Sequence, residues 1–249
     1  MVEEYCRGCL EASAGLALNP VPDSVFSRMA ACFPWNGSKL EMCRTVLRDL
    51  VGCGVESLVS WGSITLPWGR VLGKGHASIV SLGYYDNRIV AVKIRRTDSK
   101  HKSFQSEGIL QESAWRAGVA PRVYCYRDNV IVMDLLEGIP LGDLPVLTKG
   151  DVSVILSSAY ALDKAGIHHH EISRPWKHVY LTDANAVIID FGSSSYGYCR
   201  NLPSITGSLL RRVGIEISES LKSLLSTYKH GCNSRLYLSI RDFVLGYFN

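Results

Sequence analysis

Three separated groups of residues in this chain have the types and spacing that phosphate chemistry requires. The first is a glycine segment, with Gly73, Gly75, Ser78 and Val80. Lys93 follows in the run VAVK, and Asp190 stands in the tripeptide DFG after an apolar run. Backbone N–H groups of a glycine-rich turn can bind phosphate oxygens, a lysine can neutralise their charge, and a carboxylate can hold the accompanying divalent cation. Together they predict a site for a phosphate-bearing ligand.

The segments that carry these groups read as strands. Residues 78–85 and 88–96 alternate in polarity around the turn Asp86-Asn87. Lys93 is flanked by Val92 and Ile94, and a lysine buried in such a strand is costly unless an anion meets it. Residues 179–181 and 186–190 flank a polar turn at 182–185, so a hairpin is expected to lead into Asp190.

The pattern along the chain predicts an α+β fold in three parts. Residues 1–62 read as an N-terminal helical extension, 63–137 as a β-rich part with one helix near 99–117, and 138–249 as a mainly helical part. Ser38 and Glu41 have the spacing of a capping box, and Asp151 is the expected cap of a helix that ends at Gly166. Further helices are expected near 204–213, 216–228 and 235–247. The N-terminal helices are expected to dock on the part that follows, with a separate partner-binding module as the alternative.

Composition indicates an ordinary globular protein. The 27 basic and 23 acidic residues leave a net charge of +4, which suits a phosphate ligand but does not by itself indicate nucleic acid. No apolar run reaches the roughly 18 residues that span a bilayer, and the acidic start does not fit a signal peptide, so a cytoplasmic protein without membrane contact is expected. The eight cysteines are then expected to be free thiols, with a zinc site at Cys6 and Cys9 as the less favoured reading.

The order of the three groups resembles that of the protein kinases, in which a glycine loop, a strand lysine and DFG follow one another. The string HHEISRPWKHVYL followed by IIDFGSSS looks like a predicted archaeal serine/threonine kinase group, related to the kinase of the KEOPS complex and the Rio kinases. The resemblance covers about residues 66–195. It implies a bilobal kinase-like fold with a small β-rich N-lobe (63–137) and a reduced helical C-lobe (138–249). The implied activity is ATP-dependent phosphoryl transfer to serine or threonine, with Mg²⁺ or Mn²⁺.

The resemblance also implies which residues contact the nucleotide. Lys93 would contact the phosphates and pair with Glu107 on the next helix, with Glu112 as the fallback. The other implied contacts are Met133 at the back of the pocket, the backbone of Asp134 and Leu136 at the adenine, and Asp143 at the ribose. The alternatives from the residues alone are a tight turn without a ligand for the glycine segment and a solvated helix carboxylate for Glu107.

The segment that resembles the catalytic loop departs from the usual kinase pattern. Glu171 stands where a catalytic aspartate is usual, and His169 takes the place of the structural histidine before it. Trp176 occupies the position of the metal-binding asparagine, and His178, two residues later, is the implied substitute beside Asp190. Lys177 would neutralise phosphate charge. A merely polar histidine cluster, or a chance metal-binding one, is the alternative for His168 to His170.

Few residues follow Gly192, and no A-P-E motif is present, so recognition of peptides in the ordinary kinase manner and regulation by an activation loop are not expected. Three functions therefore stay open. The first is an active kinase that phosphorylates proteins, including itself. The second is an ATP-binding switch, ATPase or pseudokinase that gates an assembly. The third is a small-molecule or RNA-associated kinase, for which basic residues such as Arg211 and Arg212 give modest support.

Overall fold

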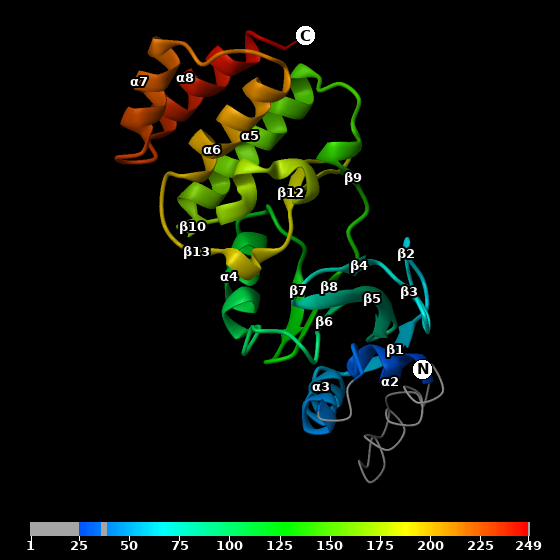
Figure 1. Ribbon diagram of the computed structural model, residues 1–249. Helices are drawn as coiled ribbons and strands as arrows, with labels where there is room; N and C mark the ends of the chain where they lie inside the picture. Colours follow the sequence, from blue (N-terminus) through cyan, green and yellow to red (C-terminus); the bar gives the residue numbers. More distant parts are fainter. Residues whose placement is uncertain (1–24, 36–38, 249) are drawn as a thin grey trace. The chain divides into compact units, whose positions relative to one another are not determined.

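The computed structural model describes residues 25–35 and 39–248 and has an α+β fold (Figure 1). The chain divides into two compact units. Unit 1 comprises residues 1–108 and 122–136, and unit 2 comprises residues 109–121 and 137–249. The division therefore falls inside helix α4 (Gln105–Arg116) and directly after Leu136. Within the described residues, no helix is long and apolar enough to cross a membrane.

Unit 1 is built on an antiparallel sheet. Its strands are β1 (Val55–Val59), β4 (Gly73–Lys74), β5 (Ser78–Tyr85), β6 (Arg88–Arg95), β7 (Val123–Tyr126) and β8 (Val130–Asp134). Their order is β1-β5-β6-β8-β7, with β4 paired to β5. A separate hairpin joins β2 (Ile64–Leu66) to β3 (Gly69–Val71).

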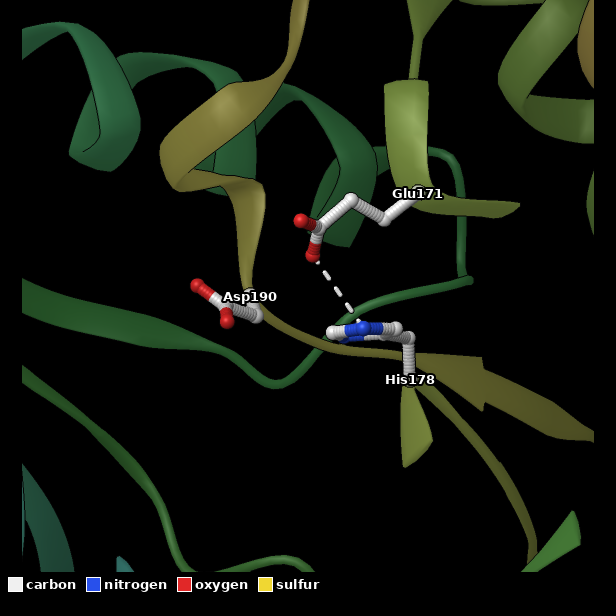
Figure 2. Close-up of side chains that lie close together, drawn as sticks. All are labelled: Glu171, His178 and Asp190. Atoms are coloured by element: carbon white, nitrogen blue, oxygen red, sulfur yellow. Dashed lines mark ion pairs between the residues drawn. The ribbon is translucent and has the colours of Figure 1, made fainter. Parts of the chain in front are cut away.

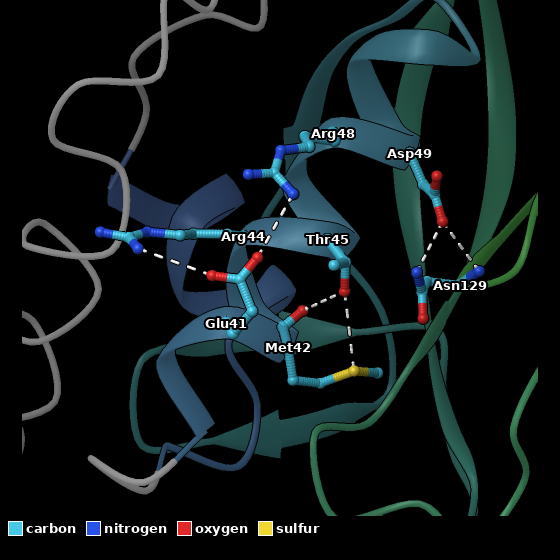
Figure 3. A network of polar contacts seen from close by, with 7 residues as sticks. All are labelled: Glu41, Met42, Arg44, Thr45, Arg48, Asp49 and Asn129. Carbon is cyan, nitrogen blue, oxygen red and sulfur yellow. Dashed lines mark hydrogen bonds and ion pairs between the residues drawn. The ribbon is translucent and has the colours of Figure 1, made fainter.

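Two helices cover one face of this sheet. Helices α2 (Val25–Ala31) and α3 (Leu40–Gly52) share a hydrophobic core with Val90, Val92 and Ile94 of β6. Because side chains alternate along a strand, Lys93 projects from the opposite face. Asp49 of α3 also accepts hydrogen bonds from the backbone N–H and the side-chain amide of Asn129 at 3.0 and 2.6 Å (Figure 3). These contacts fix α3 beside the start of β8.

Unit 2 is mainly helical. Its helices after α4 are α5 (Lys149–Lys164), α6 (Asn201–Arg212), α7 (Glu219–Tyr228) and α8 (Ser234–Leu245). Its strands are β9 (Ile139–Pro140), β10 (Ile167–His168), β11 (Val179–Leu181), β12 (Ala186–Ile188) and β13 (Ser195–Tyr196). Short 3-10 turns are η2 (Leu141–Asp143), η3 (His170–Ser173), η4 (Pro175–Lys177) and η5 (Phe191–Ser193). Strand β11 lies between β12 and β9, and β10 pairs with β13.

The predicted helices of unit 2 and the hairpin at 179–190 are confirmed within a few residues. Three local expectations are wrong. Residues 55–59 form the edge strand β1 instead of continuing the helical extension. Thr148 caps α5, and Asp151 completes the capping box as its third helical residue. The helix expected from 99 begins only at Gln105, where Ser103 accepts a hydrogen bond from the Gln105 N–H. Ser38, Cys6 and Cys9 lie outside the described residues, and α3 begins after Lys39 without a side-chain cap.

The expectation of free thiols is also wrong for six cysteines. The structure joins Cys32 to Cys43, Cys53 to Cys125, and Cys199 to Cys232 as disulfides. Their Cα atoms lie 4.6, 5.6 and 5.1 Å apart. The folding of each unit brings the paired cysteines together. Their spacing along the chain does not indicate which cysteines pair. Each pair lies within a single unit.

Candidate functional site

The glycine segment forms a hairpin between β4 and β5. Gly73 lies opposite Val80, and the Gly75 N–H donates to the carbonyl oxygen of Ser78 at 2.8 Å. Arg96 supports the tip through a bond from its side chain to the Gly75 carbonyl at 2.9 Å. A Cβ added at Gly75 would meet nothing closer than 3.7 Å. The fold therefore does not require this glycine, and close approach of a ligand would explain it.

Lys93 and Glu107 form the buried ion pair of unit 1. Lys93 Nζ lies 2.5 Å from Glu107 Oε1, and the two side chains are only 10% and 6% exposed. Lys93 faces Val80 of β5 and Ile131 of β8 in the sheet register, while Glu107 lies in the first turn of α4. The structure thus has the contact that the resemblance to kinases implies. Glu112, the fallback partner, instead pairs with Arg116 at 2.6 Å on the surface.

The remaining residues assigned to the nucleotide divide between the units. Met133 and Asp134 end β8, followed by Leu136 at the end of unit 1. The Asp134 N–H donates to the Arg122 carbonyl at 2.9 Å. The Asp134 carboxylate accepts a hydrogen bond from the Tyr124 hydroxyl. Asp143 lies exposed on η2 in unit 2. Unit 1 therefore has the residues assigned to the phosphates and adenine, and unit 2 has the one assigned to the ribose.

Three side chains of unit 2 form a possible metal cluster. One ligand atom from each of Glu171, His178 and Asp190 lies within 4.8 Å of the other two (Figure 2). The sequence named His178 and Asp190 as metal ligands and Glu171 as the catalytic group, and the structure brings all three together. His178 Nε2 lies 3.1 Å from Glu171 Oε2. Lys177 is exposed one residue before His178.

The hairpin register explains why distant residues meet here. Val179 pairs with Ile188 in the β11–β12 hairpin, so the next residues outward are His178 and Ile189. The Ile189 N–H donates to the His178 carbonyl at 2.9 Å, which continues the pairing by one residue. Asp190 follows directly. Its φ of 67° lies in the left-handed region, which is costly for a residue other than glycine and is typical of functional sites.

His169 supports the cluster from within the core. Its ring is buried, and Nε2 lies 3.1 and 3.0 Å from the carbonyl oxygens of Ile189 and Asp190. Since carbonyl oxygens only accept, Nε2 carries the proton and donates. Burial lowers the pKa of His169, which keeps the ring neutral. His169 is thus placed to fix the backbone at Asp190.

Sequence reasoning missed the polar network behind His169. The His169 N–H donates to the side-chain oxygen of Asn201 at 2.9 Å, and the Asn201 amide donates to Asp163 at 2.9 Å. Asp163 is fully buried and also accepts bonds from three backbone N–H groups at the start of α6, at residues 200–202, and from the Tyr228 hydroxyl. Burial raises the pKa of the Asp163 carboxyl, and these donors act against that shift. One sequence signal could have pointed to this network. Asp163 is an acidic residue directly after the buried Leu162 in α5, and a buried acid needs hydrogen-bond partners.

The three side chains of the cluster offer two carboxylates and one imidazole as ligands for a divalent cation. Two carboxylates supply the oxygen ligands that Mg²⁺ and Mn²⁺ prefer, and the imidazole of His178 suits Mn²⁺ better than Mg²⁺. His178 Nδ1 is buried and lacks a hydrogen-bond partner among the described residues. Nε2 faces Glu171, and an imidazole nitrogen binds a metal ion only in its unprotonated form.

No protein-family model matches the chain, and no curated protein matches it in sequence.

Proposed function

We propose that this chain is a minimal protein-kinase-like phosphotransferase that uses Mg²⁺- or Mn²⁺-ATP to phosphorylate serine or threonine. In this proposal unit 1 acts as the N-lobe and unit 2 as a reduced C-lobe. The observation that carries it is the buried Lys93–Glu107 pair. Burying two charges is expensive, and in kinases the corresponding pair holds a cation ready for the nucleotide phosphates.

The glycine hairpin and Lys93 have complementary roles in this proposal. The backbone N–H groups near Gly73 and Gly75 cover the phosphates, and the Lys93 ammonium neutralises their charge. Glu107 holds the ammonium in one position, so less conformational entropy is lost when the nucleotide binds. Met133, Asp134 and Leu136 bound the adenine side, and Asp143 contacts the ribose.

The residues of unit 2 would hold the cation and act on the hydroxyl group that receives the phosphoryl group. Asp190 and His178 would hold the cation, which when bound neutralises charge on the phosphates. Glu171 accepts the hydrogen bond, and then the proton, of the attacking hydroxyl. Lys177 adds a second positive charge. His169 keeps the Asp190 backbone in the conformation that directs this carboxylate.

The contact between Glu171 and His178 favours a second candidate function. The Glu171 carboxylate lies 3.1 Å from His178 Nε2, so it must turn away from His178 to receive a substrate proton. Slow turnover is then expected, as in an ATP-binding switch or an ATPase that gates an assembly. The two candidates differ in whether phosphate reaches a protein hydroxyl or water.

Transfer of labelled γ-phosphate to the protein itself and to a generic acceptor, measured beside phosphate release, tests the proposal. We expect transfer by the wild type and a loss of more than about a hundredfold in Glu171→Gln, because a general base contributes about 10²- to 10⁴-fold. Glu216→Gln, an exposed carboxylate outside the cluster, is the matched control and should leave transfer unchanged. Phosphate release without transfer would favour the ATPase, and equal transfer by wild type and Glu171→Gln would remove the catalytic role of Glu171.

A further inference from the structure

A pocket lies in unit 2, and none of the cluster residues Glu171, His178 and Asp190 lines it. Its volume is about 440 Å³. Besides Gly142, the residues that line it come from the end of η3, the residue that follows it, η4 and the second half of α6, and they are Ser173, Arg174, Trp176, Ser208, Arg211 and Arg212. Among the described residues that line it, none is acidic. Three arginines therefore line one pocket, and the described lining holds no carboxylate.

The three arginines differ in how they are held. Arg212 is half-buried and donates to the carbonyl oxygen of Leu141 at 3.0 Å and to that of Leu144, and its guanidinium lies 4.7 Å from the ring centre of Trp176. These partners fix Arg212 but leave its charge without an anion. Arg174 and Arg211 are exposed and have no ion pair or hydrogen bond from their side chains within the described part of the chain.

The wall of the pocket is rigid where it meets the protein core. The Ser208 hydroxyl donates to the Ser173 carbonyl at 2.5 Å, which ties α6 to η3. Gly142 forms the remaining wall, and a Cβ there would meet the Trp176 carbonyl oxygen at 2.8 Å. The backbone of η2 thus packs directly on η4. The cavity is formed by packed elements, and the arginine side chains project from fixed positions.

We propose that this pocket binds a phosphate monoester. A guanidinium presents a planar fork of donors that matches phosphate oxygens, and a monoester has three terminal oxygens and a charge of about −1.5 to −2 near neutral pH. Three arginines around one open pocket match that concentrated charge. A nucleic-acid backbone has a single charge per phosphate and requires cations spread along a track. The ligand could be a phosphorylated side chain of a protein or a free phosphorylated metabolite, since both present the same group.

The inference does not depend on phosphoryl transfer, because every lining residue belongs to unit 2 and binding is measured without turnover. Isothermal titration calorimetry of the full chain would measure binding of three probes. The first is a neutral peptide with one phosphoserine, the second is the same peptide without phosphate, and the third is O-phosphoserine as the free monoester. We expect binding of the phosphopeptide and none of the unphosphorylated peptide. Free phosphoserine that binds as tightly as the phosphopeptide indicates a metabolite site, and a clear preference for the phosphopeptide indicates a protein ligand.

Substitution of the two exposed arginines locates the binding. Arg174→Gln combined with Arg211→Gln should weaken phosphopeptide binding by about tenfold or more, since each removes charge-assisted hydrogen bonds. Arg235→Gln, an exposed arginine on α8, is the matched control and should leave binding unchanged. The proposal is overturned if the double variant binds like the wild type, or if single-stranded RNA lacking terminal phosphates binds more tightly than the phosphopeptide through the same arginines.

Discussion

The Nε2 atom of His169 lies 3.0 Å from the carbonyl oxygen of Asp190 and connects the buried core of unit 2 to the exposed carboxylate of the metal cluster. This bond acts on the backbone of Asp190, whose φ of 67° is unfavourable for a residue with a Cβ. Asn201 and Asp163 hold His169 in turn. A chain of buried hydrogen bonds therefore sets the backbone conformation of one exposed residue.

Replacement of Asp163 tests the base of that chain. Asp163→Ala leaves the first N–H groups of α6 and the Asn201 amide without their acceptor, so we expect a loss of about 3–5 kcal/mol in the free energy of unfolding. Tyr228→Phe removes one donor only and should cost about 1 kcal/mol. Urea unfolding measures both, with Asp183→Ala in the exposed turn as control. Equal effects of Asp163→Ala and Asp183→Ala would contradict the network.

Removal of one partner of the buried ion pair in unit 1 should be costly. Glu107→Gln leaves the Lys93 ammonium buried without its carboxylate, so we expect the free energy of unfolding to fall by about 3–5 kcal/mol. The double change Lys93→Met with Glu107→Leu removes both charges and should be less destabilising than Glu107→Gln alone.

The surface pair on the same helix is the control for this experiment. Glu112→Gln breaks the exposed pair with Arg116 and should change stability by less than about 1 kcal/mol. Denaturant titration of all three variants makes the comparison. If Glu107→Gln behaves like Glu112→Gln, the Lys93–Glu107 contact is not a buried ion pair in solution.

Gly75→Ala separates the folding role of the glycine hairpin from its proposed ligand role. An added Cβ meets no atom within 3.7 Å, so stability should be unchanged or rise by up to about 1 kcal/mol through the unfolded state. Under the proposed function, affinity for the ATP analogue should fall about fivefold to tenfold, as expected from the loss of one phosphate hydrogen bond. Gly62→Ala, where a Cβ would lie 2.1 Å from the Val71 carbonyl oxygen, should instead destabilise the fold. Unchanged ATP-analogue affinity in Gly75→Ala would argue against phosphates beneath this hairpin.

Asp190→Asn tests the metal cluster directly. Replacement of one of two carboxylates should weaken Mn²⁺ binding by more than about tenfold, measured by electron paramagnetic resonance of free Mn²⁺ without nucleotide. Asp183→Asn lies in the turn of the same hairpin, outside the cluster, and should bind Mn²⁺ like the wild type. Retention of wild-type affinity by Asp190→Asn would remove Asp190 from the metal site.

Local signals in the sequence account for what could be predicted. The β11–β12 hairpin follows from two short apolar runs around the turn Thr182-Asp183-Ala184-Asn185, and the meeting of His178 with Asp190 follows from the hairpin. The Lys93–Glu107 contact was expected from the resemblance to kinases, in which a strand lysine pairs with an acid of the next helix. In both cases the partners belong to consecutive elements, for which spacing restricts the geometry.

Contacts between elements far apart in the chain could not be predicted in this way. Asp163 and Asn201 are 38 residues apart, and Cys53 and Cys125 are 72 apart. Their pairing depends on how helices and strands pack, which periodicity does not report. Strand β1 was missed because VESLV is short and follows a strongly amphipathic helix. Arg211 and Arg212 were noted only as modest support for a small-molecule or RNA-associated kinase, because the packing of η3 and η4 against α6, which brings Arg174 to the same pocket, cannot be read from the sequence.

The turn of the β11–β12 hairpin can be changed without moving the residues of the Glu171–His178–Asp190 cluster. Each strand contributes three residues, and the pairing continues outward to His178 and Ile189. Replacement of residues 182–185 by another four-residue turn of the same geometry would keep both ends in register. An insertion within either strand would shift one ligand relative to the other and exchange inward and outward side chains. The loop is therefore a suitable place for a spectroscopic label or a graft, whereas the length of the two strands is not open to change.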